Sequence, residues 1–305
     1  MNMMPRVLLR LTVVTALSVL IFSGPDLLAG GLEFYATPLK DTCLRYESVW
    51  IRFAVRNTGL NRRVYRPLLV GRDCVNTSLR NIETGQLVRV CAPEPEYVPG
   101  KDESKLPGLS SGEEYTNYED LIWVAACTLD SSVRLPYFSP GRYRAVFEWT
   151  YDPFRRALQD GVTSLKDSAD FVVINASGED TRAQSAYLEA RRQVFEQGNA
   201  AGATAYWQVA QSYPHSAYAS QALTRLLNLM AERTPLPRGI TLIDVTRAFV
   251  LSSPQLPQSG RLLKEAVNQL DQARGVLFLQ SICDSAPGTL AARMAKDLMR
   301  EGRPK

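Results

Sequence analysis

The stretch Val49-Trp50-Ile51-Arg52-Phe53-Ala54-Val55-Arg56 determines how the first half of this chain is interpreted. From Ile51 onward, apolar side chains alternate with polar ones, and a period of two is typical of a strand that buries one face. The stretch Arg142–Trp149 follows a Ser-Pro-Gly turn and alternates in the same way. Several short strands separated by turn residues predict an antiparallel β-sandwich over residues 32–176.

The second half of the chain has a different period. Between residues 179 and 302 apolar side chains recur every three or four positions, which is typical of amphipathic helices. The segment Tyr213–Ala222 joins two of these helices, and Ala286–Ala295 repeats its pattern. In both segments a proline ends one helix, a serine or threonine begins the next, and alanines follow at close helix contacts. Thr241-Leu242-Ile243-Asp244 has the spacing of a capping box. We therefore expect an all-α domain with internal repeats over residues 179–302.

Both halves resemble known families. The strands VWIRFAVRNTG and PGRYRAVFEW, with the segment SSGEEYTNYEDL between them, resemble immunoglobulin-like domains of bacterial exported proteins. The Tyr213–Ala222 joint resembles tetratricopeptide-type (TPR-type) helical repeats of periplasmic envelope proteins. These resemblances imply an Ig-like sandwich followed by a TPR-like domain. The second also implies a scaffold whose concave face binds peptides or other proteins, without catalysis.

Residues 1–31 have the pattern of a secretory signal peptide. Arg6 and Arg10 precede the apolar run Leu11–Phe22, and the small residues Ala29 and Gly31 favour cleavage before Leu32. The alternative is an uncleaved membrane anchor, but the run is shorter than the ~20 residues of a spanning helix. We expect an exported protein, periplasmic or extracellular, with no membrane span after cleavage.

The number and positions of the cysteines are consistent with export. Four of the five lie in the first half, where an exported, strand-rich domain favours two disulfides over a metal site. We expect Cys74 to pair with Cys91, because Glu83-Thr84-Gly85-Gln86 lies between them like a hairpin turn. Cys43 and Cys127 would then pair by elimination, and the other pairings stay open.

Composition excludes several classes of chemistry. The chain has one histidine, His215, so metal sites and hydrolases that need two imidazoles cannot form within one protomer. Its 35 basic and 31 acidic side chains give a net charge of +4, without the clustered basic residues that indicate nucleic-acid binding. No phosphate-binding glycine motif and no G-x-S-x-G nucleophile motif is present. We expect a protein that is not an enzyme and needs no cofactor or metal.

Four aromatic residues are the candidate partner-binding group of the helical half: Tyr187, Tyr206, Trp207 and Tyr218. Their alternative role is the core between helices, where aromatic residues at helical spacing usually lie. The leading hypothesis is a non-enzymatic binding or scaffold protein of the bacterial cell envelope, with a protein or peptide partner on the helical domain. The alternative is a protease-inhibitor-like or carbohydrate-binding sandwich with a helical docking domain, suggested by a long loop over residues 92–118.

Overall fold

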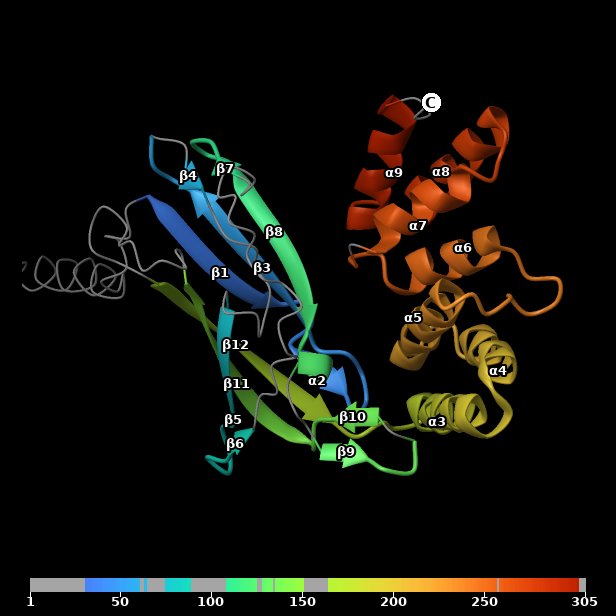
Figure 1. Ribbon diagram of the computed structural model, residues 1–305, viewed down its shortest axis with the longest axis horizontal. Coiled ribbons are helices and arrows are strands. Elements are labelled where there is room, and N and C mark those ends of the chain that lie inside the picture. Colours follow the sequence, from blue (N-terminus) through green and yellow to red (C-terminus); the bar gives the residue numbers. More distant parts are fainter. Residues whose placement is uncertain are drawn as a thin grey trace, which may run out of the picture.

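The computed structural model describes residues 31–60, 63–64, 75–88, 108–124, 128–133, 135–150, 164–256 and 258–301 (Figure 1). The predicted signal peptide up to residue 30 lies outside this part, as do residues 92–107 of the expected long loop. Within the described part, no helix is both long enough and apolar enough to cross a membrane.

A three-stranded and a five-stranded sheet enclose the core of the first half. The smaller has the order β1-β3-β8, from Leu32–Pro38, Trp50–Asn57 and Glu114–Asp120, and both of its pairings are antiparallel. The larger has the order β2-β12-β11-β5-β6, and its strands are Thr42–Leu44, Ser164–Ile174, Gly141–Thr150, Val75–Asn81 and Leu87–Val88. Two small pairs complete the strands: β4 (Arg63–Val64) with β7 (Gly108–Leu109), and β9 (Thr128–Asp130) with β10 (Leu135–Tyr137).

The alternating stretches form the middle strands of these sheets. On β3, Ile51, Phe53 and Val55 are fully buried, and on β11 the odd-numbered residues from 143 to 149 are buried in the same core. The rings of Phe53 and Phe147 meet edge to face, with centroids 4.9 Å apart. Burial of these side chains is the main favourable contribution to this core.

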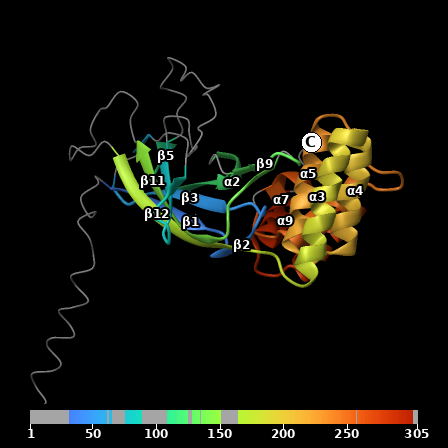
Figure 2. The same cartoon turned by 90° about the horizontal axis from the view of Figure 1, so that it is seen from below.

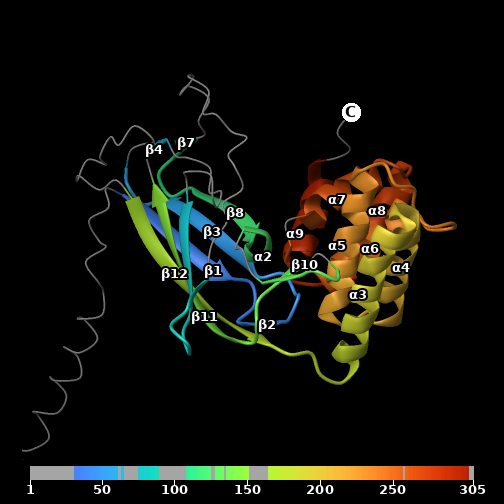
Figure 3. The ribbon, with the colours of Figure 1, turned by 60° about the horizontal axis from the view of Figure 1, so that its bottom comes forward.

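Helices make up the second half (Figures 2 and 3). The first three, α3 (Glu179–Gln197), α4 (Asn199–Ser212) and α5 (Ala217–Ala231), pack side by side. Four more follow them, namely α6 (Leu242–Ser252), α7 (Gln258–Val267), α8 (Gln272–Ser285) and α9 (Leu290–Glu301). Ser216 caps α5 through its side chain, and Thr241 with Asp244 forms the predicted capping box at the start of α6.

The prediction of an Ig-like antiparallel sandwich followed by an all-α TPR-like domain is wrong. The larger sheet is mixed, because β2 pairs with β12 in parallel. The first half also contains a short helix, α2 (Leu121–Val124), directly after β8. In the described residues the fold is a mixed one, with the three-stranded and five-stranded sheets, two strand pairs, the short α2 and the seven helices α3 to α9.

The strand-rich half and the helices share part of one core. Tyr46, Val133 and Leu135 are buried in the cluster that also contains the inner residues of α3, α4 and α5. The hydroxyl of Tyr218 on α5 donates a hydrogen bond to the carbonyl oxygen of Arg45. This contact fixes α5 against the turn between β2 and β3, and it places the walls of the site described next.

Candidate functional site

A cleft runs between the strand-rich half and the helices. It contains two cavities: the first, of about 330 Å³, lies between the β2–β3 turn and the ends of α5 and α6. The second, of about 430 Å³, lies between the end of β8 and helices α5, α6 and α7. Ser48, Trp50 and Gln221 line both cavities, so the two cavities lie side by side.

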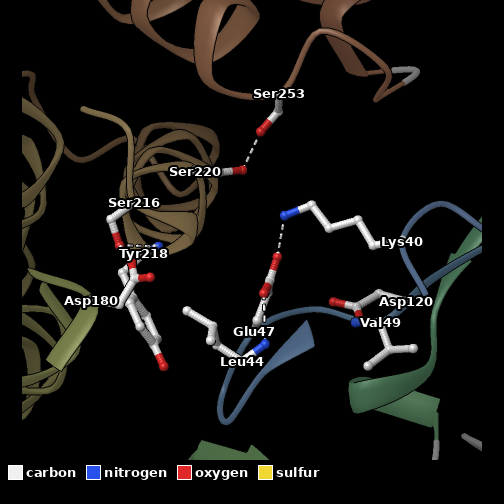
Figure 4. A network of polar contacts seen from close by, with 10 residues as sticks. All are labelled: Lys40, Leu44, Glu47, Val49, Asp120, Asp180, Ser216, Tyr218, Ser220 and Ser253. Atoms are coloured by element: carbon white, nitrogen blue, oxygen red, sulfur yellow. Dashed lines mark hydrogen bonds and ion pairs between the residues drawn. The ribbon is translucent and has the colours of Figure 1, made fainter. Parts of the chain in front are cut away.

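The β2–β3 turn supplies the strand-side wall. The Glu47 carboxylate accepts hydrogen bonds from the backbone N–H of Leu44 at 2.8 Å and from Nζ of Lys40 at 2.5 Å (Figure 4). Tyr46 has a left-handed backbone with φ 68°, a conformation that costs free energy for a residue with a side chain. The Glu47 contacts hold this turn in shape, and Ser48 and Trp50 therefore keep a fixed position at the cleft.

The helix-side wall is fixed by hydroxyl groups. Ser216 donates a hydrogen bond of 2.5 Å to Asp180 on α3, and its oxygen accepts the backbone N–H of Tyr218 (Figure 4). The hydroxyls of Ser220 on α5 and Ser253 after α6 bond to each other. These contacts connect α3, α5 and the end of α6, so the wall does not depend on a ligand to take its shape.

Asp120 is one of two carboxylates that line the second cavity. Its Oδ1 accepts the backbone N–H groups of Val49 at 3.1 Å and Ile122 at 3.2 Å. Burial raises its pKa to about 6, although these bonds, the Ser48 side chain and the charge of Arg225 act in the opposite direction. A carboxyl group with this pKa changes charge in a pH range that is common in natural environments.

The first cavity offers no activated nucleophile. Cys43 lines it, but burial raises the pKa of this thiol to about 12, so it stays protonated and inert. His215 also lines the cavity and is exposed in the turn before α5. In the described ranges, no three His, Cys, Asp or Glu side chains gather as metal ligands. The described groups of the cleft are suited to binding through apolar contact and hydrogen bonds.

Three of the four aromatic candidates cannot contact a partner. Tyr187, Tyr206 and Tyr218 are at most 1% exposed, and the Tyr187 ring packs against the other two with centroids 5.9 and 5.8 Å apart. They are the core between α3, α4 and α5, which corrects the interpretation of Tyr187, Tyr206 and Tyr218 as surface anchors. Trp207 is half-buried and packs against the same core.

Sequence reasoning missed the residues that do line the cleft. Trp50 was counted only as part of a strand, and Ser48, Asp120 and Gln221 carried no motif. Trp50 stands one position before the regular alternation of β3 begins, and in the structure its side chain is partly exposed.

The cysteine and loop predictions fall largely outside the described residues. The expected hairpin turn does form between β5 and β6, but Cys74, Cys91 and Cys127 are not described. Cys43 is a free thiol in the structure, so the predicted pairing of Cys43 with Cys127 is not formed there, and the Cys74–Cys91 pairing stays a prediction. The long-loop prediction is wrong at its end, because residues 114–118 belong to β8.

Comparison with known proteins gives no family. No family model and no curated protein matches this chain. Among solved structures, an alkylpurine DNA glycosylase from Pseudomonas fluorescens has 10% identity and a TM-score of 0.25, covering 48% of this chain and 31% of that one. A β-glucosidase from Listeria innocua has 13% identity and a TM-score of 0.24, covering 48% and 16%. The chain thus spans less than a third of either protein, and likenesses this weak carry no argument about function.

Proposed function

We propose that this chain is an exported, non-enzymatic binding protein whose cleft holds an extended segment of a protein or peptide partner. The observation that carries the proposal is the pair of adjacent cavities between the strand-rich half and the helices. Concave sites with apolar walls and a few fixed polar groups are the usual form of binding sites.

The shape of the cleft supports an elongated ligand. Ser48, Trp50 and Gln221 lie where the two cavities meet, so a ligand that fills both must pass over them. Ser48 and Gln221 are each at least nine-tenths buried, and they offer hydrogen-bonding groups beside the partly exposed side chain of Trp50. An extended peptide presents backbone donors and acceptors along its length together with side chains for the two cavities.

The preformed walls support binding without a large rearrangement. The Lys40–Glu47 ion pair, the Ser216–Asp180 bond and the Ser220–Ser253 bond hold the two sides before any ligand enters. A site that is already ordered loses less conformational entropy when it binds. The export part of the proposal rests on the signal-like residues 1–31, which fit a periplasmic or an extracellular protein.

Site-specific photo-crosslinking in envelope extracts tests the proposal. A photo-reactive amino acid replaces Gln221 in the full chain, and a matched variant carries it at Leu277, which is 70% exposed on α8 and does not line the cleft. We expect one protein to crosslink at position 221 and not at 277. A Ser220→Trp variant, which narrows the first cavity, should abolish that crosslink. Equal crosslinking at both positions, or none at 221, would contradict a cleft partner.

A further inference from the structure

The three-stranded sheet has one edge that no other described strand covers. In the order β1-β3-β8, β8 is an outer strand, and its seven residues pair with β3 in regular register, without a bulge or a proline. The opposite edge is occupied, because the backbone N–H of Ala36 on β1 donates to the Asp167 carboxylate at 2.8 Å. Natural proteins usually block such edges with bulges, prolines or covering segments, so β8 is a candidate for the addition of a further strand.

The backbone of β8 presents alternate residues to this edge. At one end the N–H of Leu121 donates to the carbonyl oxygen of Val49 at 2.9 Å, and at the other end the N–H of Asn57 donates to that of Glu113 at 2.9 Å. Bonded positions alternate in an antiparallel pair, so the odd-numbered residues of β8 bond to β3 and the even-numbered ones direct N–H and C=O outward. In the described part of the chain, no backbone hydrogen bond reaches the outward groups of the four even-numbered residues: Glu114, Thr116, Tyr118 and Asp120.

The same strand runs along the cleft. Its residue Asp120 lines the second cavity, and Thr116 and Tyr118 line a third cavity of about 660 Å³ between the sheet and the start of α9. In Figure 1, β8 lies on the side of the three-stranded sheet that is nearest to α9. Because side chains alternate between the two faces of a strand, a segment added along β8 would direct every second side chain towards these cavities.

The third cavity favours an acidic side chain on that segment. Two arginines and one carboxylate line it: Arg52 pairs with Glu114 across β3 and β8, whereas the exposed Arg293 on α9 forms no ion pair within the described ranges. A guanidinium group binds carboxylates through charge-assisted hydrogen bonds. Charge complementarity therefore indicates a carboxylate of the partner beside Arg293.

We propose that the bound segment of the partner joins the three-stranded sheet as a fourth strand along β8, with an aspartate or glutamate side chain beside Arg293. This inference rests on the proposed function and specifies how the segment is held. In strand addition, main-chain hydrogen bonds give the affinity and pockets for alternate side chains give the specificity. Recognition therefore depends on the outward N–H of Thr116 and on the charge of Arg293.

Hydrogen exchange of the full chain without a partner, followed by NMR, tests whether the edge is accessible. The amides of Thr116 and Tyr118 should exchange at least about 100-fold faster than that of Asn117, which lies between them and bonds to β3. Equally slow exchange at the three amides would mean that the edge is already covered, and it would overturn the proposal.

Crosslinking in envelope extracts, with a photo-reactive amino acid in place of Tyr118, tests the pairing itself. Thr116→Pro removes one outward N–H and no bond to β3, and edge strands tolerate proline at such positions. Thr116→Val keeps the N–H. We expect about five-fold weaker crosslinking with proline, the effect of one hydrogen bond, and no change with valine. Slow exchange at Asn117 checks that the proline variant keeps its pairing with β3, and equal crosslinking of the two variants would overturn strand addition.

A second pair of variants tests the charge and leaves the strand untouched. Arg293→Ala should weaken crosslinking at position 118 by about two- to five-fold, the effect of one exposed ion pair. Lys296→Ala removes the same charge from an exposed position on α9 outside the three cavities, and it should have no effect. Equal crosslinking of these two variants would overturn the acidic side chain.

This inference and the proposed function fail in different ways. If position 221 crosslinks a partner and the proline and valine variants bind it equally, strand addition is wrong and the cleft function stands. If position 118 crosslinks with the expected dependence while position 221 does not, strand addition holds and the cleft function is wrong. If neither position crosslinks a protein, both are wrong.

Discussion

Replacing Asp120 with asparagine should change how the stability of this protein depends on pH. Burial raises the pKa of this carboxyl group to about 6 in the folded state, from an ordinary value of 3.8. Between these two values the folded state binds the proton and the unfolded state releases it. The stabilising effect of Asp120 protonation is therefore fully present below about pH 4 and is lost as the pH rises through about 6.

The magnitude follows from the size of the pKa shift. A difference of about two units corresponds to about 3 kcal/mol in the free energy of unfolding. The asparagine variant does not titrate, so it should gain about 3 kcal/mol relative to the wild-type chain between pH 4 and pH 7. Carboxyl groups with lowered pKa values act in the opposite direction, but they are the same in both proteins and cancel in the difference: Asp130, Glu148, Asp170 and Asp244.

Urea unfolding followed by tryptophan fluorescence at half-unit steps from pH 4 to pH 7.5 measures this difference. The fully buried Trp149 gives a strong signal for loss of the core between the sheets. A difference between the two proteins that stays constant over this range would refute the argument that Asp120 is desolvated. A difference of the opposite sign would mean that the charge of Arg225 outweighs burial.

Four further substitutions test single contacts, each by its urea midpoint. Gly202→Ala should destabilise the fold by about 1–3 kcal/mol, because the new Cβ would lie 3.2 Å from Cα of Val194 and closer still to its side chain. Gly260→Ala should cost less, since its new Cβ meets only the flexible end of a methionine. Tyr218→Phe should cost about 1 kcal/mol through loss of the hydrogen bond to the β2–β3 turn. Thr241→Ala should cost about 1 kcal/mol through loss of the capping box.

Features set by neighbouring residues could be predicted from the sequence. The alternation in β3 and β11 follows from the opposite directions of successive side chains on a strand, and each buries the expected face. The Thr241–Asp244 capping box and the Ser216 cap depend on spacings of two or three residues, which are visible in the chain itself. Each of these features depends only on residues within one short segment of the chain.

The direction of strand pairing could not be predicted in the same way. β2 has three residues, and its parallel pairing with β12 joins Thr42 to Val172 across most of the strand-rich half. A three-residue strand has the same alternation whichever way its neighbour runs. Likewise, tyrosines at helical spacing have the same sequence pattern whether they face a partner or a second helix. Tyr187, Tyr206 and Tyr218 are buried because α3, α4 and α5 pack together around them.

The cleft depends on how the interior is divided among the helices. Tyr46, Val133 and Leu135 from the strand-rich half share a core mainly with α3, α4 and α5, whereas α8 and α9 build a separate one around Phe278 and Ile282. The strand-rich half is therefore held against the end of the helical array that α3, α4 and α5 form (Figure 1). Side chains at this boundary, such as Trp50, stay partly exposed because no neighbour covers them completely. A binding site of this origin leaves no motif in the sequence, since its lining comes from segments that are far apart in the chain, from Ser48 to Glu265.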